Sequence, residues 1–254
     1  MDKKHFLVTA DDVGIINSID KAVQKLIDKG VINNISIFIN TNHNKAWIKE
    51  LSEDVYLSLH LTFSYGKPIT EQEWVPSLVN DDGFFLSPHK PSIGNADGID
   101  KSIQDFLLFI DEYVSEKELE LECKAQVNEF CNVFGREPDY INVHHDLDKS
   151  NKICRVIKKC CPEYQTRQML LDSKQVECCL YHFLPEKIDF GEAMNLIGDM
   201  FQTARNKNEE SGKPVELIFH PAFYSEGLQK FSSYAVAREI EYKVLLKLAE
   251  CGLL

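Results

Sequence analysis

The chain has 254 residues and a formal net charge of -12. This length suits one large α/β domain, and the acidity argues against nucleic acid or an anionic membrane as a partner, because both attract clustered Lys and Arg. No stretch approaches the roughly 18 uninterrupted apolar residues of a membrane span. The apolar run behind Lys3 and Lys4 is short and stops at Asp11, so we expect no signal peptide and a cytoplasmic location.

Strand and helix patterns alternate along the chain, without a long linker rich in Pro, Gly or Ser. The alternation predicts one domain over residues 1–254 with parallel strands. In the first quarter of the chain we predict strands at 6–10, 32–39 and 55–61, with a helix from about 18 to Gly30 and a short helix at 44–51 between them. Helices at about 101–113 and 116–134 follow, then a strand at 140–144 and a helix at 151–159. The last predicted elements are strands at 164–170 and 215–219, with a helix at 192–205 between them, and a helix at 234–250.

Residues 63 to about 100 show no such periodicity and are punctuated by Gly, Pro and Asp. A connection this long inside a compact domain is usually functional. Its aromatic residues are candidates for a wall that stacks on a sugar ring, or for a small core of the loop itself. They are Phe63, Tyr65, Trp74, Phe84 and Phe85.

The eight cysteines lie mostly on apolar helical positions or in adjacent pairs, and no Cys-x-x-Cys pair is present. We therefore expect reduced core cysteines rather than a disulfide framework or a structural zinc site.

Asp11 and Asp12 stand side by side at the end of the first predicted strand. A carboxylate withdrawn from water is normally paired, hydrogen-bonded or bound to a metal, and two adjacent ones repel each other. The alternative interpretation of such a pair is a turn or a helix N-cap. Histidines at the ends of later predicted strands favour a functional site over a turn or a cap.

His60 lies at the end of the third predicted strand, His144 and His145 close a later one, and His220 follows the last. The carboxyl ends of parallel strands meet at the face where α/β proteins place ligands and catalysis. One Asp and two His with open coordination positions suit a catalytic divalent metal. Taken singly, each histidine also fits an ordinary structural role at a strand end.

Asp12, His60 and His144 fit this ligand set, with Asp11 as general base and His220 as the acid that protonates the leaving group. One Asp and two His do not identify the ion. We favour Mg²⁺, with Zn²⁺ or another transition metal as the alternative.

Several ordered motifs resemble the YdjC-like family of carbohydrate deacetylases, whose studied members include chitooligosaccharide deacetylases. Residues 9–14, Thr-Ala-Asp-Asp-Val-Gly, resemble the family's Asn-Ala-Asp-Asp-Phe-Gly opening. The other matching segments are 59–62 with 66–68, 77–79 with 82–83, and 216–221. The resemblance covers nearly the whole chain.

The resemblance implies a distorted (β/α) barrel, similar to a TIM barrel, with about seven parallel strands. It also implies a metal-dependent hydrolase that removes the acetyl group from an N-acetylated sugar. The roles it implies for Asp12, His60, His144, Asp11 and His220 are those given above. Arg167 matches a family arginine and would orient Asp11 or bind substrate; the alternative is a salt-bridging strand arginine.

The chain departs from the family pattern at three places. Asn142 stands where the family usually has Asp, Asp146 stands where it has a third His, and Ala222 replaces the Gly after His-Pro. If the family Asp supports a metal-binding imidazole, Asn142 supports it without a charge, and metal affinity or activity falls roughly 10- to 100-fold. Asp146 would be an extra ligand.

We predict a metal-dependent deacetylase that hydrolyses an N-acetylated (chito)oligosaccharide to acetate and a free amino sugar. The alternatives are another metallohydrolase on the same scaffold and a catalytically impaired sugar-binding homologue. The expected partner is a small carbohydrate, with a homodimer as the commonest assembly.

Overall fold

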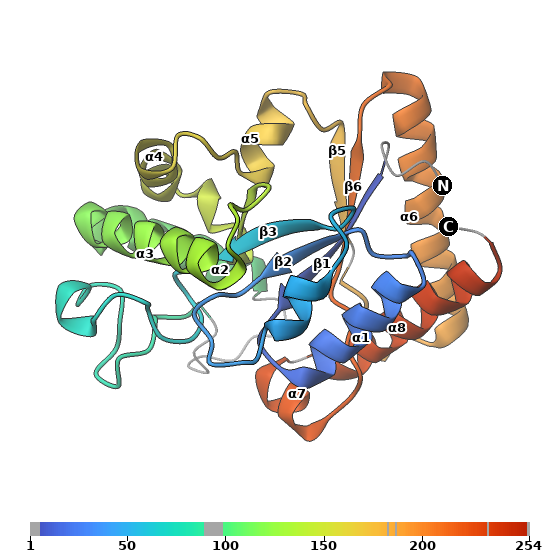
Figure 1. Ribbon diagram of the computed structural model, residues 1–254, viewed down its shortest axis with the longest axis horizontal. Helices are drawn as coiled ribbons and strands as arrows, with labels where there is room; N and C mark the ends of the chain where they lie inside the picture. Colours follow the sequence, from blue (N-terminus) through green and yellow to red (C-terminus); the bar gives the residue numbers. More distant parts are fainter. Residues whose placement is uncertain (1–5, 89–98, 182, 186, 233, 253–254) are drawn as a thin grey trace. The chain divides into compact units, whose positions relative to one another are not determined.

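A computed structural model describes residues 6–88, 99–181, 183–185, 187–232 and 234–252. In this part of the chain six strands form one parallel sheet (Figure 1) in the order β4-β3-β2-β1-β6-β5. The strands are β1 Phe6–Val13, β2 Asn34–Ile37, β3 Tyr56–Leu61, β4 Ile141–Val143, β5 Cys178–Tyr181 and β6 Val215–Phe219.

Eight α-helices and three 3₁₀ helices lie between and after the strands of the described part. The α-helices are α1 Asn17–Asp28, α2 Ile99–Tyr113, α3 Glu116–Phe134, α4 Asn151–Cys160, α5 Arg167–Asp172, α6 Phe190–Ser211, α7 Glu226–Phe231 and α8 Ala235–Glu250. The 3₁₀ helices are η1 Ala46–Glu50, η2 Gln72–Trp74 and η3 His144–Lys149. Among these helices none is both long and apolar enough to cross a membrane.

The strand order confirms the predicted α/β class and its barrel-like winding. β1 lies between the second strand and the last, as the first strand does in a (β/α) barrel. The described residues form six strands where we expected about seven.

The strand predicted at 164–170 is wrong. Only Thr166 forms an isolated parallel bridge, to Ile141, and Arg167 already begins α5. The segment that follows is rich in Gln, Met and Leu, which are strong helix formers, and their preference prevails over the apolar pattern read as a strand. Four short elements, β5, α7, η2 and η3, were not predicted.

Contacts divide the chain into two compact units. The first comprises Met1–Ile37, His43–Ser58 and Met169–Leu254, and the second comprises Phe38–Asn42 and Leu59–Gln168. The division passes through β3 and α5.

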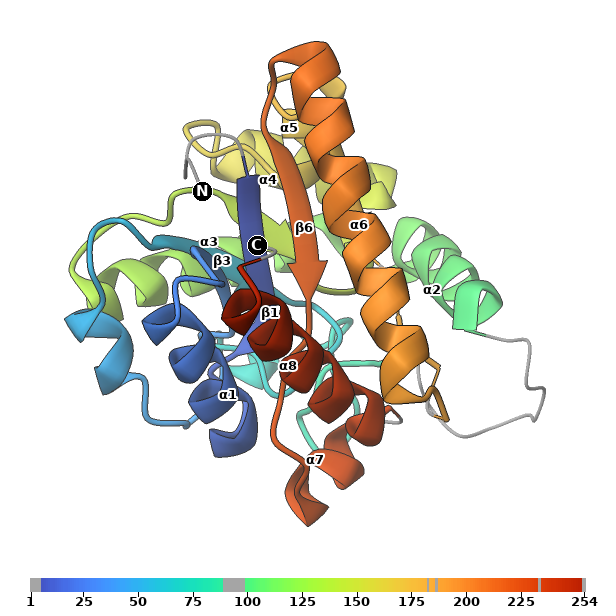
Figure 2. The ribbon, with the colours of Figure 1, turned by 90° about the vertical axis from the view of Figure 1, so that its right-hand side faces the viewer.

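In the first unit β1 pairs with β2 on one side and with β6 on the other, and β6 also pairs with β5. Helix α6 packs along β6, α1 packs on β1, and α8 contacts both helices (Figure 2). The inward residues of β1 and β6 are almost fully buried, so the central strands of this unit lie in its core.

In the second unit the end of β3 pairs with β4, and α3 packs on α4. The described part of the long connection after β3 is packed against α3. Glu122 of α3, buried in the unit, accepts hydrogen bonds from the backbone N of Ile69 and Thr70 at 2.9 Å each. Burial raises the pKa of Glu122, and these hydrogen bonds oppose that rise. Residues 89–98 of the predicted loop lie outside the described residues.

Among the loop's aromatic residues Tyr65 is half-buried, with its ring centroid 6.3 Å from that of His144, and the other four separate into two groups. Phe63 and Phe85 are buried, so they form the small core of the loop. Trp74 and Phe84 have exposed fractions of 68% and 47%. These two side chains are therefore the ones available to a ligand.

Candidate metal centre

Asp11 and Asp12 lie inside β1 rather than after it, which corrects the predicted end of the first strand. The pairing of β1 with β2 shifts register between Ala10 and Val13, and Asp12 has a φ of 66°. A bulge of this kind often re-aims a side chain beside a functional site. The left-handed conformation costs a non-glycine residue on the order of 1–3 kcal/mol, so the surrounding structure must hold Asp12 in place.

The turn after this bulge is anchored by Asp20 of α1. Gly14 donates its backbone N–H to Oδ1 of Asp20 at 2.8 Å, while His43 Nε2 lies 3.0 Å from Oδ2. Burial raises the pKa of Asp20, and the Gly14 hydrogen bond opposes the rise. This anchor was not predicted from the sequence, although an acidic residue in the first turn of a helix is a common signal.

His60 and His144 come together in the second unit. His60 is the penultimate residue of β3, and His144 directly follows β4. Nε2 of His60 and Nδ1 of His144 are 3.1 Å apart, and Phe38 makes T-shaped contacts with both rings. Two ligands that bind one ion at right angles, each at about 2.1 Å, are themselves about 3 Å apart. The spacing of the two nitrogens therefore suits ligands of a single ion.

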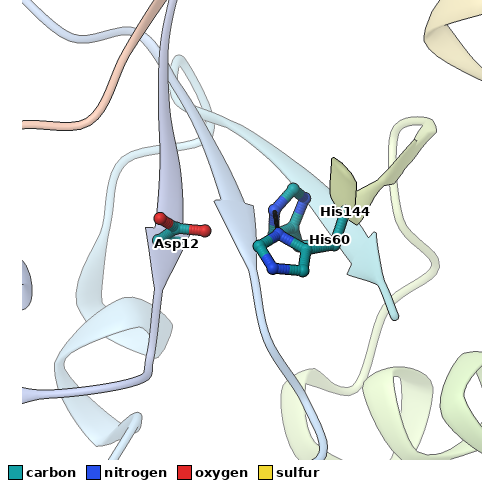
Figure 3. Close-up of side chains that lie close together, drawn as sticks. All are labelled: Asp12, His60 and His144. Atoms are coloured by element: carbon teal, nitrogen blue, oxygen red, sulfur yellow. Dashed lines mark hydrogen bonds between the residues drawn. The ribbon is translucent and has the colours of Figure 1, made fainter. Parts of the chain in front are cut away.

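Asp12 joins the two histidines in a group that could hold a metal ion (Figure 3). One ligand atom from each of Asp12, His60 and His144 lies within 4.8 Å of the others, and all three residues are buried. Two imidazole nitrogens and a carboxylate oxygen form a donor set that suits a catalytic divalent ion. These are the three residues that the sequence predicted as ligands, and the donor chemistry fits a divalent metal.

Asp146 does not belong to this group; its Oδ2 accepts a hydrogen bond from Lys149 Nζ at 2.9 Å. Both His145 and Asp146 have left-handed backbones, with φ of 59° and 52°. Nδ1 of His145 lies 3.1 Å from Oγ of Ser64, and its ring lies 3.8 Å from that of His144. This strained turn after β4 fixes where His144 can point.

Arg167 lies beside β4. Its Nη1 donates to Oδ1 of Asn142 at 2.8 Å, and both side chains are buried. Asn142 is the register partner of His60 in the β3–β4 ladder. Asp148 has its pKa raised by burial, which the charge of Arg167 opposes.

His220 directly follows β6 and is half-buried. Its ring stacks on Phe183, with centroids 5.1 Å apart, and its backbone N donates to Oε2 of Glu241 at 2.6 Å. Burial raises the pKa of Glu241 to about 8.

Asp12 also forms an ion pair with Arg238 of α8, whose Nη2 lies 2.5 Å from Asp12 Oδ2. Arg238 and Glu241 were not predicted from the sequence. A signal was available, because both fall on the helix face that also carries Leu245 and Leu248, where apolar residues are expected.

A family model described as "YdjC-like protein" matches residues 5–249. The chain belongs to the YdjC-like family. Among curated relatives of this family member, a carbohydrate deacetylase of Thermoanaerobacter pseudethanolicus is 25% identical, covering 95% of this chain and 90% of that protein. A carbohydrate deacetylase of Halalkalibacterium halodurans is 26% identical, with 96% and 97% covered.

The fold is similar to a crystal structure from Enterococcus faecalis, described as that of a cellobiose-phosphate cleavage protein. The TM-score is 0.70 at 24% identity, and the match covers 98% of this YdjC-like chain and 95% of the other. At this identity the likeness concerns the fold alone.

Proposed function

We propose that this YdjC-like protein is a metal-dependent carbohydrate deacetylase that hydrolyses the N-acetyl group of an N-acetylated (chito)oligosaccharide to acetate and a free amino sugar. The observation that carries the proposal is the grouping of Asp12, His60 and His144. The predicted enzyme class, a hydrolase acting on a linear amide bond, agrees with the names of the curated relatives. We propose that residues 1–254 form one domain of this family.

Three protein side chains hold the ion in this proposal: Asp12, His60 and His144. When bound, a divalent metal lowers the pKa of water and polarises a carbonyl oxygen. We favour Mg²⁺, with Zn²⁺ or another transition metal as the alternative. A set with two imidazoles also suits transition metals, so the experiments below compare several ions.

The chain's own groups move the protons. Asp11, adjacent to Asp12 on β1 and 4% exposed, accepts the proton of the attacking water. His220 donates a proton to the nitrogen of the departing amino sugar, because an unprotonated amine anion is a poor leaving group. Arg167 is our candidate for substrate binding, and its contact with Asn142 supports a place near His60.

The exposed aromatic residues support a carbohydrate as the ligand. Sugar rings present apolar C–H faces that pack on aromatic side chains, and Phe84 and Trp74 expose such surfaces in the connection that begins directly after β3. Lys67 Nζ lies 4.7 Å from the centroid of Phe84 and supplies a donor for sugar hydroxyls. We further propose a cytoplasmic location and a homodimer, with neither nucleic acid nor a membrane as a partner.

The test of the metal centre is calorimetric titration of chelator-stripped protein with Zn²⁺ and Mn²⁺. Wild-type protein should bind one ion, and Asp12→Asn and His60→Ala should each weaken binding at least tenfold. Asp28→Asn is the matched control because Asp28 is exposed at the end of α1. Equal affinity in wild type and His60→Ala would contradict the proposed ligand set.

Turnover separates the proposal from its two alternatives. Acetate release from N,N'-diacetylchitobiose supports the deacetylase. Phosphate release from an aryl phosphate would indicate a different metallohydrolase. Saturable sugar binding without turnover would indicate an impaired homologue, the alternative that Asn142 favours because it replaces a charged family residue.

A further inference from the structure

Helix α8 carries two charged side chains on its buried face. Arg238 and Glu241 are 3% and 5% exposed, and residues three apart lie on the same side of a helix. A buried charge is costly unless it is paired and hydrogen-bonded. The contacts of Arg238 and Glu241 therefore identify what this face of α8 holds in place.

The guanidinium of Arg238 contacts three side chains of the first unit. Its Nη2 donates to Asp12 Oδ2 at 2.5 Å and to Tyr234 Oη at 2.8 Å, and its Nε donates to Ser232 Oγ at 3.1 Å. The planar fork of donors is thus fixed by two groups besides Asp12. A guanidinium held in this way can orient a carboxylate.

The residue that it contacts needs such support. Asp12 lies in the bulge of β1 with a φ of 66°, a conformation that persists only where neighbouring groups enforce it. The ion pair with Arg238 occupies one carboxylate oxygen and so restricts rotation of the side chain. Residues that orient a metal-binding side chain often matter nearly as much as the ligand itself.

The same helix also holds the segment that carries His220. Glu241 Oε2 accepts the backbone N–H of His220 at 2.6 Å, and the backbone O of Arg238 accepts the N–H of Ala222 at 3.3 Å. These bonds hold α8 against His220 and against the residues just after it. One turn of α8 thus contacts two segments that the proposed function assigns to the reaction.

We propose that Arg238 is a positioning residue that holds Asp12 in its metal-binding orientation. In this proposal the role of Asp12 as a metal ligand rests on the proposed function. It predicts that geometry, and not charge alone, is what Arg238 contributes. A Lys at this position keeps the charge but cannot reproduce the forked contacts.

The test measures Zn²⁺ affinity by calorimetry in chelator-stripped protein. Arg238→Lys should weaken binding about 10- to 100-fold, the usual effect of losing a group that orients a ligand. Arg238→Met, which removes the charge as well, should also bind more weakly than wild type. Lys243→Met is the matched control, because Lys243 lies on the exposed face of α8 in an ion pair with Glu239. It should leave the affinity unchanged.

Thermal unfolding of each variant identifies those that remain folded, and Arg238→Lys is the variant to use if Arg238→Met does not fold. An unchanged Zn²⁺ affinity in folded Arg238→Lys would overturn the proposal. So would tighter binding by Arg238→Met, since Arg238 would then merely compete with the ion for Asp12. The readout needs no substrate, so wild-type protein that binds Zn²⁺ without releasing acetate would contradict the proposed function and leave this result standing.

Discussion

Arg167 donates a hydrogen bond from Nη1 to Oδ1 of Asn142, 2.8 Å away. Asn142 is 1% exposed and lies beside His60 in the β3–β4 register. An aspartate here would give Arg167 an ionic partner and add negative charge next to an imidazole that is proposed to bind the metal.

Asn142→Asp should therefore raise Zn²⁺ affinity about tenfold, because a charged group near a ligand imidazole increases its basicity. Calorimetry on chelator-stripped protein measures the change. Asn132→Asp adds the same charge at an exposed position of α3 and serves as the control. Equal affinities for the two variants would mean that Asn142 does not influence the metal centre.

Phe84→Ala should raise KM for a chitooligosaccharide about 2- to 10-fold, since an aromatic stacking contact is worth about 0.5–1.5 kcal/mol. The ring is 47% exposed, so the substitution removes little packing. Initial rates of acetate release at several substrate concentrations give KM. Tyr113→Ala removes another exposed ring, that of α2, and should leave KM unchanged. A KM that is the same in Phe84→Ala and wild type would exclude Phe84 from the sugar site.

Glu241 should make the fold less stable as pH rises. Its pKa is raised by burial from 4.5 to about 8, so the folded state binds its proton more tightly than the unfolded state does. The stabilisation from this proton is fully present below about pH 4.5 and is lost as pH rises through about 8. The charged groups that face Glu241 include Arg238. The backbone N–H of His220 donates a hydrogen bond to the Glu241 carboxylate.

Glu241→Gln keeps an acceptor for the His220 N–H but does not titrate. Relative to wild type, the variant should therefore gain stability steadily between pH 5 and pH 8, measured as the difference in Tm at each pH. Glu239→Gln changes a half-buried carboxylate of the same helix, which is paired with Lys243, and should show a flat difference. A flat difference for Glu241→Gln as well would contradict the raised pKa.

Much of this fold follows from local sequence pattern. Helix α3 and strand β6 have the predicted bounds, because Gly135 ends the helix in a left-handed conformation and β6 is a continuous apolar run broken only by Glu216. Position also predicted the metal group, since carboxyl ends of parallel strands share one face. Asp12, His60 and His144 could therefore be predicted as ligands from this rule, without further knowledge of the fold.

Other features depend on contacts between distant segments. The left-handed Asp12 results from a bulge whose partner strand and supporting Arg238 lie elsewhere in the chain. Residues 164–170 fit a strand pattern, yet only Thr166 pairs with β4. Local pattern does not encode the distant partners that hold Asp12. At 167–172 the helix preference of the residues themselves outweighed the strand pattern.

The most direct test is acetate release from N,N'-diacetylchitobiose by protein stripped with chelator and resupplied with Mg²⁺, Zn²⁺, Co²⁺ or Mn²⁺. We predict no acetate without metal, release with at least one ion, and loss of that activity in His60→Ala. Protein that binds an ion at Asp12, His60 and His144 but releases no acetate with any of the four would contradict the deacetylase account.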